Sequence, residues 1–217
     1  MNSEIYLLTP PEVLSGELAI DQFVPSLLKA LDGGPVSCVL LSGTANSEVF
    51  LQEIASTLRP LVQERNIAFL IEDHFKLAAS LGCDGVHLTS AENFKDAREF
   101  LGDDSIVGVD CGISRHDAIL VGEAGADYVA FNNRKPLPEI DDPDVRAFEE
   151  GGPRGSDLLT WWQTMMTPPC VSMDDVSIAD AVLHAEAGAD FVAVQNAVWQ
   201  HTADPAIAIA EINEAIA

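Results

Sequence analysis

Basic side chains are scarce in this sequence. Eleven lysines and arginines stand against 35 aspartates and glutamates among 217 residues, which gives a formal net charge of −24. Clustered lysines and arginines provide most of the affinity for a nucleic-acid backbone or an anionic membrane surface. Their shortage excludes both as expected partners. A phosphorylated ligand would have to find the few cations that it needs close to its binding site.

Long apolar runs and paired cysteines are also missing. No apolar stretch reaches the ~20 residues that cross a bilayer, and the first residues, MNSEIYLLTPPEV, lack the basic segment of a secretory signal. The four cysteines lie far apart, at Cys38, Cys83, Cys111 and Cys170. We therefore expect packed, reduced thiols without a disulfide framework or a zinc cluster, in a globular protein of the cytoplasm.

Short apolar runs alternate with helical patterns along the whole chain. The runs are rich in β-branched residues and apolar on both faces, as expected for strands buried between a core and covering helices. They span residues 5–8, 36–41, 67–71, 85–88, 105–109, 128–131, 169–172 and 191–194. Between them, apolar residues recur at helical spacing, for example from Phe23 to Leu31. This alternation predicts an α/β fold, a single (β/α)8 TIM barrel over residues 1–217.

An internal repeat supports this count of strands. EAGADYVA at 123–130 returns as EAGADFVA at 186–193, and LGCDGVHL at 81–88 is a looser copy. Each copy predicts a helix end, a glycine cap, an aspartate and then the next buried strand. The second interval between copies is longer than the first, and the excess falls in residues 132–156, which are rich in proline, glycine and acids. We expect a long loop there, after the sixth strand.

Polar residues stand where the predicted strands end. In barrels of this kind the site forms at the C-terminal ends of the strands. The carboxylates and imidazoles at these positions are Glu72, Asp73, His74, His87, Glu92 and Asp110. Carboxylates favour Mg²⁺, whereas added imidazoles suit a transition metal. The structural alternative is that Asp73 caps the helix starting near Phe75 and that His87 forms a hydrogen bond inside the barrel.

Signals for phosphate binding are weak. Barrel phosphate sites commonly use backbone N–H groups after strands seven and eight, yet residues 172–175 bring two carboxylates and no glycine. Asn196, after the eighth strand, is a remaining donor. Arg134 and Lys135 are adjacent bases at the start of the long loop. They either hold a phosphate or carboxylate or pair with acids of the same loop.

The chain resembles the thiamine phosphate synthase family, which includes the thiazole tautomerases. The resemblance rests on IYLLTP near the start, on residues 68–90, on SIVGVDCG at 105–112, on EAGADYVAF at 123–131 and on GADFVAVQNAVW at 188–199. It implies a barrel transferase of thiamine biosynthesis that joins a hydroxymethylpyrimidine diphosphate to a thiazole phosphate, with Mg²⁺ on the diphosphate. The implied partners are small phosphorylated or heterocyclic ligands, without nucleic acid or membrane, and a homodimer stays open.

The resemblance also assigns roles to single residues. Asp73 falls on the family's magnesium-binding aspartate, and Glu92 lies near its second metal carboxylate. The catalytic candidates are Asp73, His74 and Lys135. The substrate-binding candidates are His87, Thr89, Asp110, Asn132, Arg134, Ser172, Gln195 and Asn196.

The match thins where phosphates should bind. The family's Gln-x-Arg-x-Lys grip after the second strand is replaced by Leu-Leu-Ser-Gly-Thr at 40–44, and its glycine pair after the seventh strand by Met173-Asp174. The phosphate-binding serine after the eighth strand is Asn196 here. Each charge-assisted hydrogen bond to phosphate is worth about 1.5–3 kcal/mol. Losing the Arg and the Lys would therefore weaken diphosphate binding by about 10²–10⁴.

Three functions stay open for such a diverged family member. An enzyme of thiamine metabolism predicts Mg²⁺-dependent binding of the diphosphate through Asp73. A non-catalytic relative that binds a ligand or a partner protein predicts no turnover. A different metal-dependent enzyme on the same barrel predicts a stoichiometric transition metal, held by Asp73, His74, His87 and Asp110.

Overall fold

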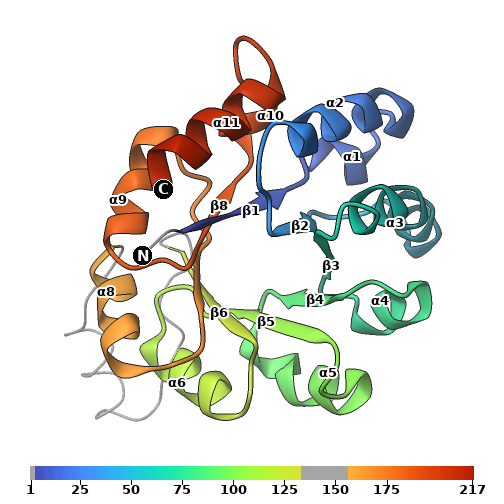
Figure 1. Ribbon diagram of the computed structural model, residues 1–217. Helices are drawn as coiled ribbons and strands as arrows, with labels where there is room; N and C mark the ends of the chain where they lie inside the picture. Colours follow the sequence, from blue (N-terminus) through green and yellow to red (C-terminus); the bar gives the residue numbers. More distant parts are fainter. Residues whose placement is uncertain (1–2, 133–155) are drawn as a thin grey trace.

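The computed structural model describes residues 3–132 and 156–217, which form a barrel of parallel strands surrounded by helices (Figure 1). The strands follow one another around the barrel in chain order, and β8 (Phe191–Val194) closes the ring by pairing with β1 (Glu4–Leu8). Parallel pairing of consecutive strands needs a crossover outside the barrel, and the helices supply these crossovers. The (β/α)8 barrel predicted from the sequence is confirmed.

Each predicted strand overlaps one observed strand. The remaining strands are β2 (Cys38–Leu41), β3 (Ala68–Glu72), β4 (Gly85–Leu88), β5 (Ile106–Asp110), β6 (Tyr128–Phe131) and β7 (Cys170–Ser172). The described helices are α1 (Glu12–Ser15), α2 (Ile20–Asp32), α3 (Glu48–Gln63), α4 (Phe75–Leu81), α5 (Phe94–Leu101), α6 (Arg115–Glu123), α8 (Ser156–Met165), α9 (Ile178–Glu186), α10 (Asn196–Trp199) and α11 (Pro205–Ile216), with a 3-10 turn at Ala91–Asn93. None of these helices is long and apolar enough to cross a membrane. The loop predicted at 132–156 lies, apart from its two end residues, outside the described residues.

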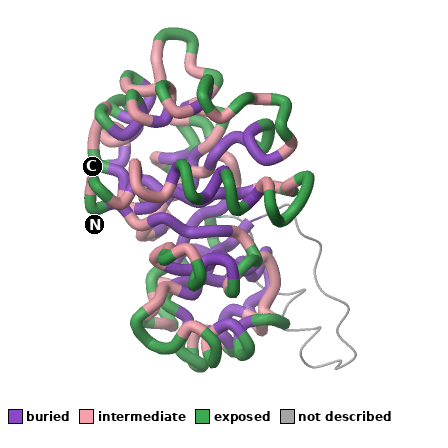
Figure 2. The backbone as a smooth tube through the Cα atoms, turned by 90° about the vertical axis from the view of Figure 1, so that its right-hand side faces the viewer, coloured by how far each residue is buried: buried purple, intermediate pink, exposed green. Residues whose placement is uncertain are grey.

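Apolar side chains fill two layers, one inside the barrel and one between the barrel and the helices. Alternate strand residues face outward, so Val39 and Phe69 pack in the outer layer with helix residues such as Leu58. The inner layer consists of Tyr6, Cys38, Leu40, Leu70, Tyr128, Ala130, Val171, Met173 and Ala193. Figure 2 shows buried backbone along the strands and exposed backbone on the outer turns of the helices. The inner layer thus makes the barrel interior a packed core rather than a channel.

The repeated aspartates tie the strands together in pairs at the N-terminal end of the barrel. In all three copies the carboxylate accepts the backbone N–H of a residue at the start of the preceding strand. The pairs are Asp84 with Phe69 at 2.7 Å, Asp127 with Val107 at 2.7 Å, and Asp190 with Cys170 at 2.8 Å. A side chain of an earlier helix donates to the same carboxylate, and these donors are Gln63, Arg98 and Gln163. We call each set an aspartate clamp.

A glycine with positive φ precedes each clamp by two residues. The φ angles are 70° at Gly82, 92° at Gly125 and 102° at Gly188. A residue with a Cβ is strained in this left-handed region, which explains why the repeat carries glycine at the helix end. The helix–glycine–aspartate–strand order predicted from the repeat is confirmed.

The cysteines are packed thiols, as predicted. All four are free of disulfides, and Cys38, Cys111 and Cys170 are buried. Burial raises the pKa of the Cys83 and Cys170 thiols to about 11, so both are protonated at neutral pH.

Candidate functional site

The C-terminal mouth of the barrel carries a ring of mostly polar side chains. Leu40, Leu70 and Val171 face the barrel interior, and side chains along a strand alternate, so the residue two positions later faces the same way. Applied to all eight strands, this rule selects Leu8, Ser42, Glu72, Thr89, Asp110, Asn132, Met173 and Gln195. The rule thus places Thr89, Asp110, Asn132 and Gln195, four of the residues predicted to bind substrate, on the side of the mouth, and a hydrogen bond joins Asp110 to Asn132. We call this set the mouth ring.

Below the mouth ring lies a buried polar network. The hydroxyls of Tyr6 and Tyr128 share a hydrogen bond of 2.7 Å, and the Tyr128 hydroxyl is 2.8 Å from Nδ1 of His87. His87 stacks on Tyr128 with an interplanar angle of 14°. Burial raises the pKa of both tyrosines well above the ordinary value, so both stay neutral. The interpretation of His87 as a residue hydrogen-bonded inside the barrel is confirmed.

Asp110 and Asn132 join the ends of β5 and β6. Oδ1 of Asp110 accepts the N–H of Gly112 at 2.8 Å, and Oδ2 accepts Nδ2 of Asn132 at 2.7 Å. Both residues are 8% exposed. The two contacts fix the orientation of this carboxylate–amide pair before any ligand arrives.

Asp73 connects two neighbouring loops of the rim. Its backbone has a φ of 56°, in the left-handed region that aspartate tolerates better than most residues. Its carboxylate accepts the N–H of Thr89 at 2.8 Å and the Thr89 hydroxyl at 2.6 Å. The prediction that Asp73 caps α4 is wrong, because His74 holds the cap position and the Asp73 carboxylate binds Thr89 on the next loop instead.

The metal candidates do not converge. The described residues contain no group of three or more His, Cys, Asp or Glu side chains placed to hold a metal ion. Both oxygens of Asp73 bind Thr89, and Glu92 is exposed in the 3-10 turn. His74 turns its Nδ1 to the Glu72 carbonyl, 2.7 Å away. The transition-metal set predicted from Asp73, His74, His87 and Asp110 is therefore not formed among the described residues, and the Mg²⁺ roles of Asp73 and Glu92 stay a prediction.

At the end of β8, a carboxylate binds the start of α10. Oδ1 of Asp175 accepts the N–H of Gln195 at 3.1 Å and the N–H of Asn196 at 2.9 Å, while Oδ2 accepts Nδ2 of Asn196. Nε2 of Gln195 donates to the Thr9 carbonyl at 2.8 Å. These partners of Asp175 were not predicted from the sequence. The only sequence signal for this contact was the pair of adjacent carboxylates after the seventh strand. In the folded chain one of them, Asp175, binds the backbone of Gln195, which lies 20 residues later.

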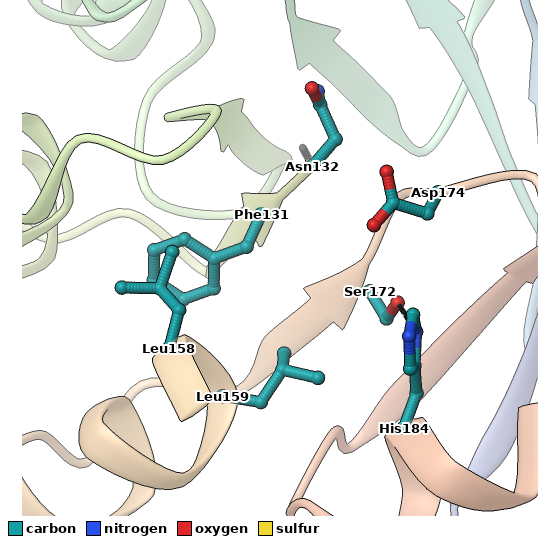
Figure 3. Close-up of a pocket in the computed structure, with 7 residues that line it drawn as sticks. All are labelled: Phe131, Asn132, Leu158, Leu159, Ser172, Asp174 and His184. Atoms are coloured by element: carbon teal, nitrogen blue, oxygen red, sulfur yellow. Dashed lines mark hydrogen bonds between the residues drawn. The ribbon is translucent and has the colours of Figure 1, made fainter. Parts of the chain in front are cut away.

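Ser172 faces the helix layer rather than the mouth. It pairs in register with Phe131 and Val192, which belong to the outer core. Its hydroxyl forms a hydrogen bond with Nδ1 of His184 on α9 (Figure 3). Leu158 and Leu159 close the space beside this pair, and the remaining cavity of about 10 Å³ has room for about one water molecule. Ser172 thus connects β7 to α9.

Two larger cavities border the mouth, and both are acidic. The first, about 260 Å³, lies between the loops after β2 and β3 and includes Glu48, Glu72 and Asp73 in its lining. The second, about 430 Å³, lies between α1, α2 and α10 and includes Glu12 and Glu17. No lysine or arginine is among the described residues that line either cavity. Arg134 and Lys135, the predicted cations of the rim, lie outside the described residues.

Comparison with known proteins points to one family. A family model described as "Thiamine monophosphate synthase" matches residues 5–198. A thiamine-phosphate synthase of Rhodospirillum centenum is 44% identical over 213 residues, which cover 96% of this chain and 95% of the relative. One of Hyphomonas neptunium is 35% identical, with 97% and 92% covered. A solved thiamine phosphate pyrophosphorylase from Pyrococcus furiosus has the same fold, with a TM-score of 0.74 at 22% identity and 98% and 95% of the chains covered.

Proposed function

The chain belongs to the thiamine monophosphate synthase family, and on that premise we propose that it is a transferase of thiamine biosynthesis. The proposed reaction joins a hydroxymethylpyrimidine diphosphate to a thiazole acceptor at the C-terminal mouth of the barrel. The observation that carries the proposal is the 44% identity to the Rhodospirillum centenum synthase over nearly the full length of both chains. Similarity of that extent supports a shared reaction class more strongly than a shared fold does.

The mouth ring supplies the proposed contacts to the heterocycles. The Asp110 carboxylate and the Asn132 amide are fixed by their mutual hydrogen bond, and together they offer acceptors and a donor to the polar edge of a pyrimidine. Thr89, oriented by Asp73, and Gln195, oriented by the Thr9 carbonyl, complete the set. Because these side chains are already ordered, binding a heterocycle does not carry the entropy cost of ordering them.

The cations for the diphosphate are proposed from the sequence. Arg134 and Lys135 remain the candidates, with Lys135 as the catalytic one, because they are adjacent bases directly after β6. Mg²⁺ enters the proposal as the ion that the family implies on the diphosphate. We further propose that residues 1–217 form one domain and work in the cytoplasm on small phosphorylated or heterocyclic ligands.

A direct assay tests the proposed reaction. The purified full chain is incubated with the pyrimidine diphosphate and either thiazole phosphate or thiazole alcohol, with Mg²⁺ and with a chelator. The coupled product is then detected by fluorescence after oxidation. We expect product, and we expect Asp110→Asn to lower kcat/KM at least about tenfold, because one fixed acceptor is lost. The matched control is Asp103→Asn, which makes the same change at an exposed loop position and should leave kcat/KM unaltered.

A second candidate function is ligand binding without turnover. The acidic cavity between the loops after β2 and β3 favours it, since no lysine or arginine is among the described residues that line this cavity. Absence of product with both acceptors after long incubation would overturn the transferase. Calorimetric binding of either thiazole compound in the same preparation would then establish the binding function.

A further inference from the structure

The larger cavity beside the mouth, about 430 Å³, has the form of a small-molecule site. It lies where helices from the two ends of the chain meet, with α1 and α2 on one side and α10 on the other (Figure 1). Ligand sites in proteins are commonly clefts of about 300–1,000 Å³ with apolar walls and a few convergent polar groups. The mouth-ring residues are not among the described residues that line this cavity. A ligand in it would therefore occupy a place of its own.

An aromatic pair forms the apolar wall of the cavity. Phe23 on α2 and Trp199 on α10 pack edge to face, with ring centroids 5.0 Å apart and an interplanar angle of 67°. Nε1 of Trp199 donates to the Leu8 carbonyl at 2.7 Å, which fixes the orientation of the indole. Phe23 is 1% exposed and Trp199 is only partly buried, so the indole is the ring that a ligand can reach. Leu18 and Pro10 extend the apolar surface.

Two polar side chains on α2 are available to a ligand in this cavity. Gln22 and Ser26 line it one helical turn apart. None of the side-chain hydrogen bonds within residues 3–132 and 156–217 uses either of them. Both can accept and donate hydrogen bonds. The cavity thus combines an ordered aromatic wall with polar groups that have capacity to spare.

The charge of the lining selects the kind of ligand. Glu12 and Glu17 line the cavity, and neither forms an ion pair in the part of the chain that the structure describes. Lys29, the base on α2, is held by Asp204 at 2.9 Å. A flat, weakly hydrated cation is attracted both by the carboxylates and by the face of an indole ring. An anion is repelled by the same carboxylates.

We propose that this cavity is a binding site for a flat organic cation, an aromatic ring that carries a positive charge and no phosphate group. The indole of Trp199 provides the stacking surface, and Glu12 and Glu17 provide the attraction. Thiazolium ions belong to this class of ligand. The site stands apart from the proposed transferase function, because binding there requires neither turnover nor a residue of the mouth ring.

A matched pair of probes tests the selection by charge. The thiazole alcohol and its N-methylated thiazolium differ by one methyl group and one positive charge. Calorimetry on the full chain at low ionic strength should give an affinity for the thiazolium about tenfold higher, a difference of about 1.4 kcal/mol. Combining Glu12→Gln with Glu17→Gln should reduce this preference about fivefold or more. The matched control combines Glu53→Gln with Glu64→Gln, the same change of charge at exposed positions on α3 and at its end, and should keep the preference.

The tryptophans test the location of the bound cation. The chain has three of them, and the thiazolium should shift the indole N–H resonance of Trp199 while those of Trp161 and Trp162 stay in place. The Trp199→Phe variant assigns the resonance and keeps an aromatic ring in the wall. Asp110→Asn changes the mouth ring and should leave the affinity for the thiazolium unaltered.

Several results would overturn the proposal. They are equal affinities for the two probes, a preference that survives the double change at Glu12 and Glu17, a shift confined to Trp161 or Trp162, and no measurable binding of the thiazolium. Weaker binding of the thiazolium to Asp110→Asn would place the cation at the mouth and would also refute the site. A thermal melt checks that the double variant folds, and Glu17→Gln alone replaces it otherwise. Failure of the coupling assay would refute the transferase and leave these binding results to decide the role of the cavity.

Discussion

Gly108 makes room for the ring at the centre of the barrel. A Cβ at this position would lie 1.8 Å from Cζ of Tyr128, far inside van der Waals contact. The ring fills that space and places its hydroxyl between Tyr6 and His87. The absence of one side chain on β5 therefore positions the polar network under the mouth ring.

Replacing Gly108 by alanine should consequently displace Tyr128 and break the network. We expect Gly108→Ala to lower the free energy of unfolding by about 1–3 kcal/mol, the usual cost of overpacking a filled core. Urea denaturation monitored by fluorescence measures this change in the free energy of unfolding. Combining Gly108→Ala with Tyr128→Ala should cost less than the sum of the single changes, since the second removes the clash. Additive losses would show that the ring does not depend on Gly108.

The buried thiol of Cys170 should respond to pH in a defined window. Its pKa is raised to about 11 by burial, whereas a thiol in an unfolded chain ionises near pH 8.5. Between these values the unfolded state has released the proton that the folded state retains, so stability falls as pH rises through the window. We expect Cys170 in the native protein to be alkylated at pH 8 at least tenfold more slowly than in urea. Equal rates, measured by mass spectrometry of the labelled peptide, would contradict the assigned burial.

At the scale of elements, the aspartate clamps hold strands at the end of the barrel opposite the mouth. Asp190 accepts the N–H of Cys170 and Nε2 of Gln163, so it binds β7 and α8 at the start of β8. We expect Asp190→Ala to lower the free energy of unfolding by about 1–3 kcal/mol, because a buried N–H and an amide lose their acceptor. The coupling activity should change little, since the clamp lies far from the mouth ring in the fold.

The control for this loss is Asp103→Ala at an exposed loop position. Chemical denaturation of both variants separates the lost acceptor from the change in net charge. A loss in Asp103→Ala equal to that in Asp190→Ala would assign the effect to charge rather than to the clamp.

The elements themselves were predictable from the sequence because their signals are local. Strand 128–131 and its glycine cap at Gly125 follow from patterns within eight residues, and the repeat supplied the count. The role of Asp73 was not predictable in this way. Its carboxylate could cap α4 or bind Thr89, and the outcome depends on which N–H lies near it in the folded chain. The position of the Thr89 N–H is set by the packing of neighbouring strands in the closed barrel, not by the local sequence.

The candidate site was predictable in part for the same reason. The predicted strand ends placed Asp110 and Asn132 at the mouth. Successive side chains of a strand point alternately to the barrel interior and to the helices, so an error of one residue reverses the prediction. One residue of register separates Ser172, which faces α9, from Met173 on the mouth ring. The hydrogen bonds of Asp175 were not predicted, because their donors, in Gln195 and Asn196, follow a different strand.

For the whole molecule, the net charge of −24 is the dominant electrostatic fact. Mutual repulsion of carboxylates destabilises a folded state with this excess. Raising ionic strength from about 0.01 M to about 1 M shortens the Debye length from about 30 Å to about 3 Å. We therefore expect Tm to rise by several degrees over this range, about 2–4 °C for each kcal/mol of relieved repulsion. Sodium and choline chloride should act alike, and an unchanged Tm in both would refute the repulsion.

The aspartate clamps also describe how the barrel is divided. They join β3 to β4, β5 to β6 and β7 to β8, and between β1 and β2 the Ser37 hydroxyl donates a hydrogen bond to the Glu4 carboxylate instead. The molecule is thus a ring of four two-strand modules, each fastened internally at its base. A chain cut before α5, as at the exposed Glu92, keeps Arg98 with Asp127 and every other fastening within one fragment or the other. Such fragments are the natural units for reassembling or recombining this barrel.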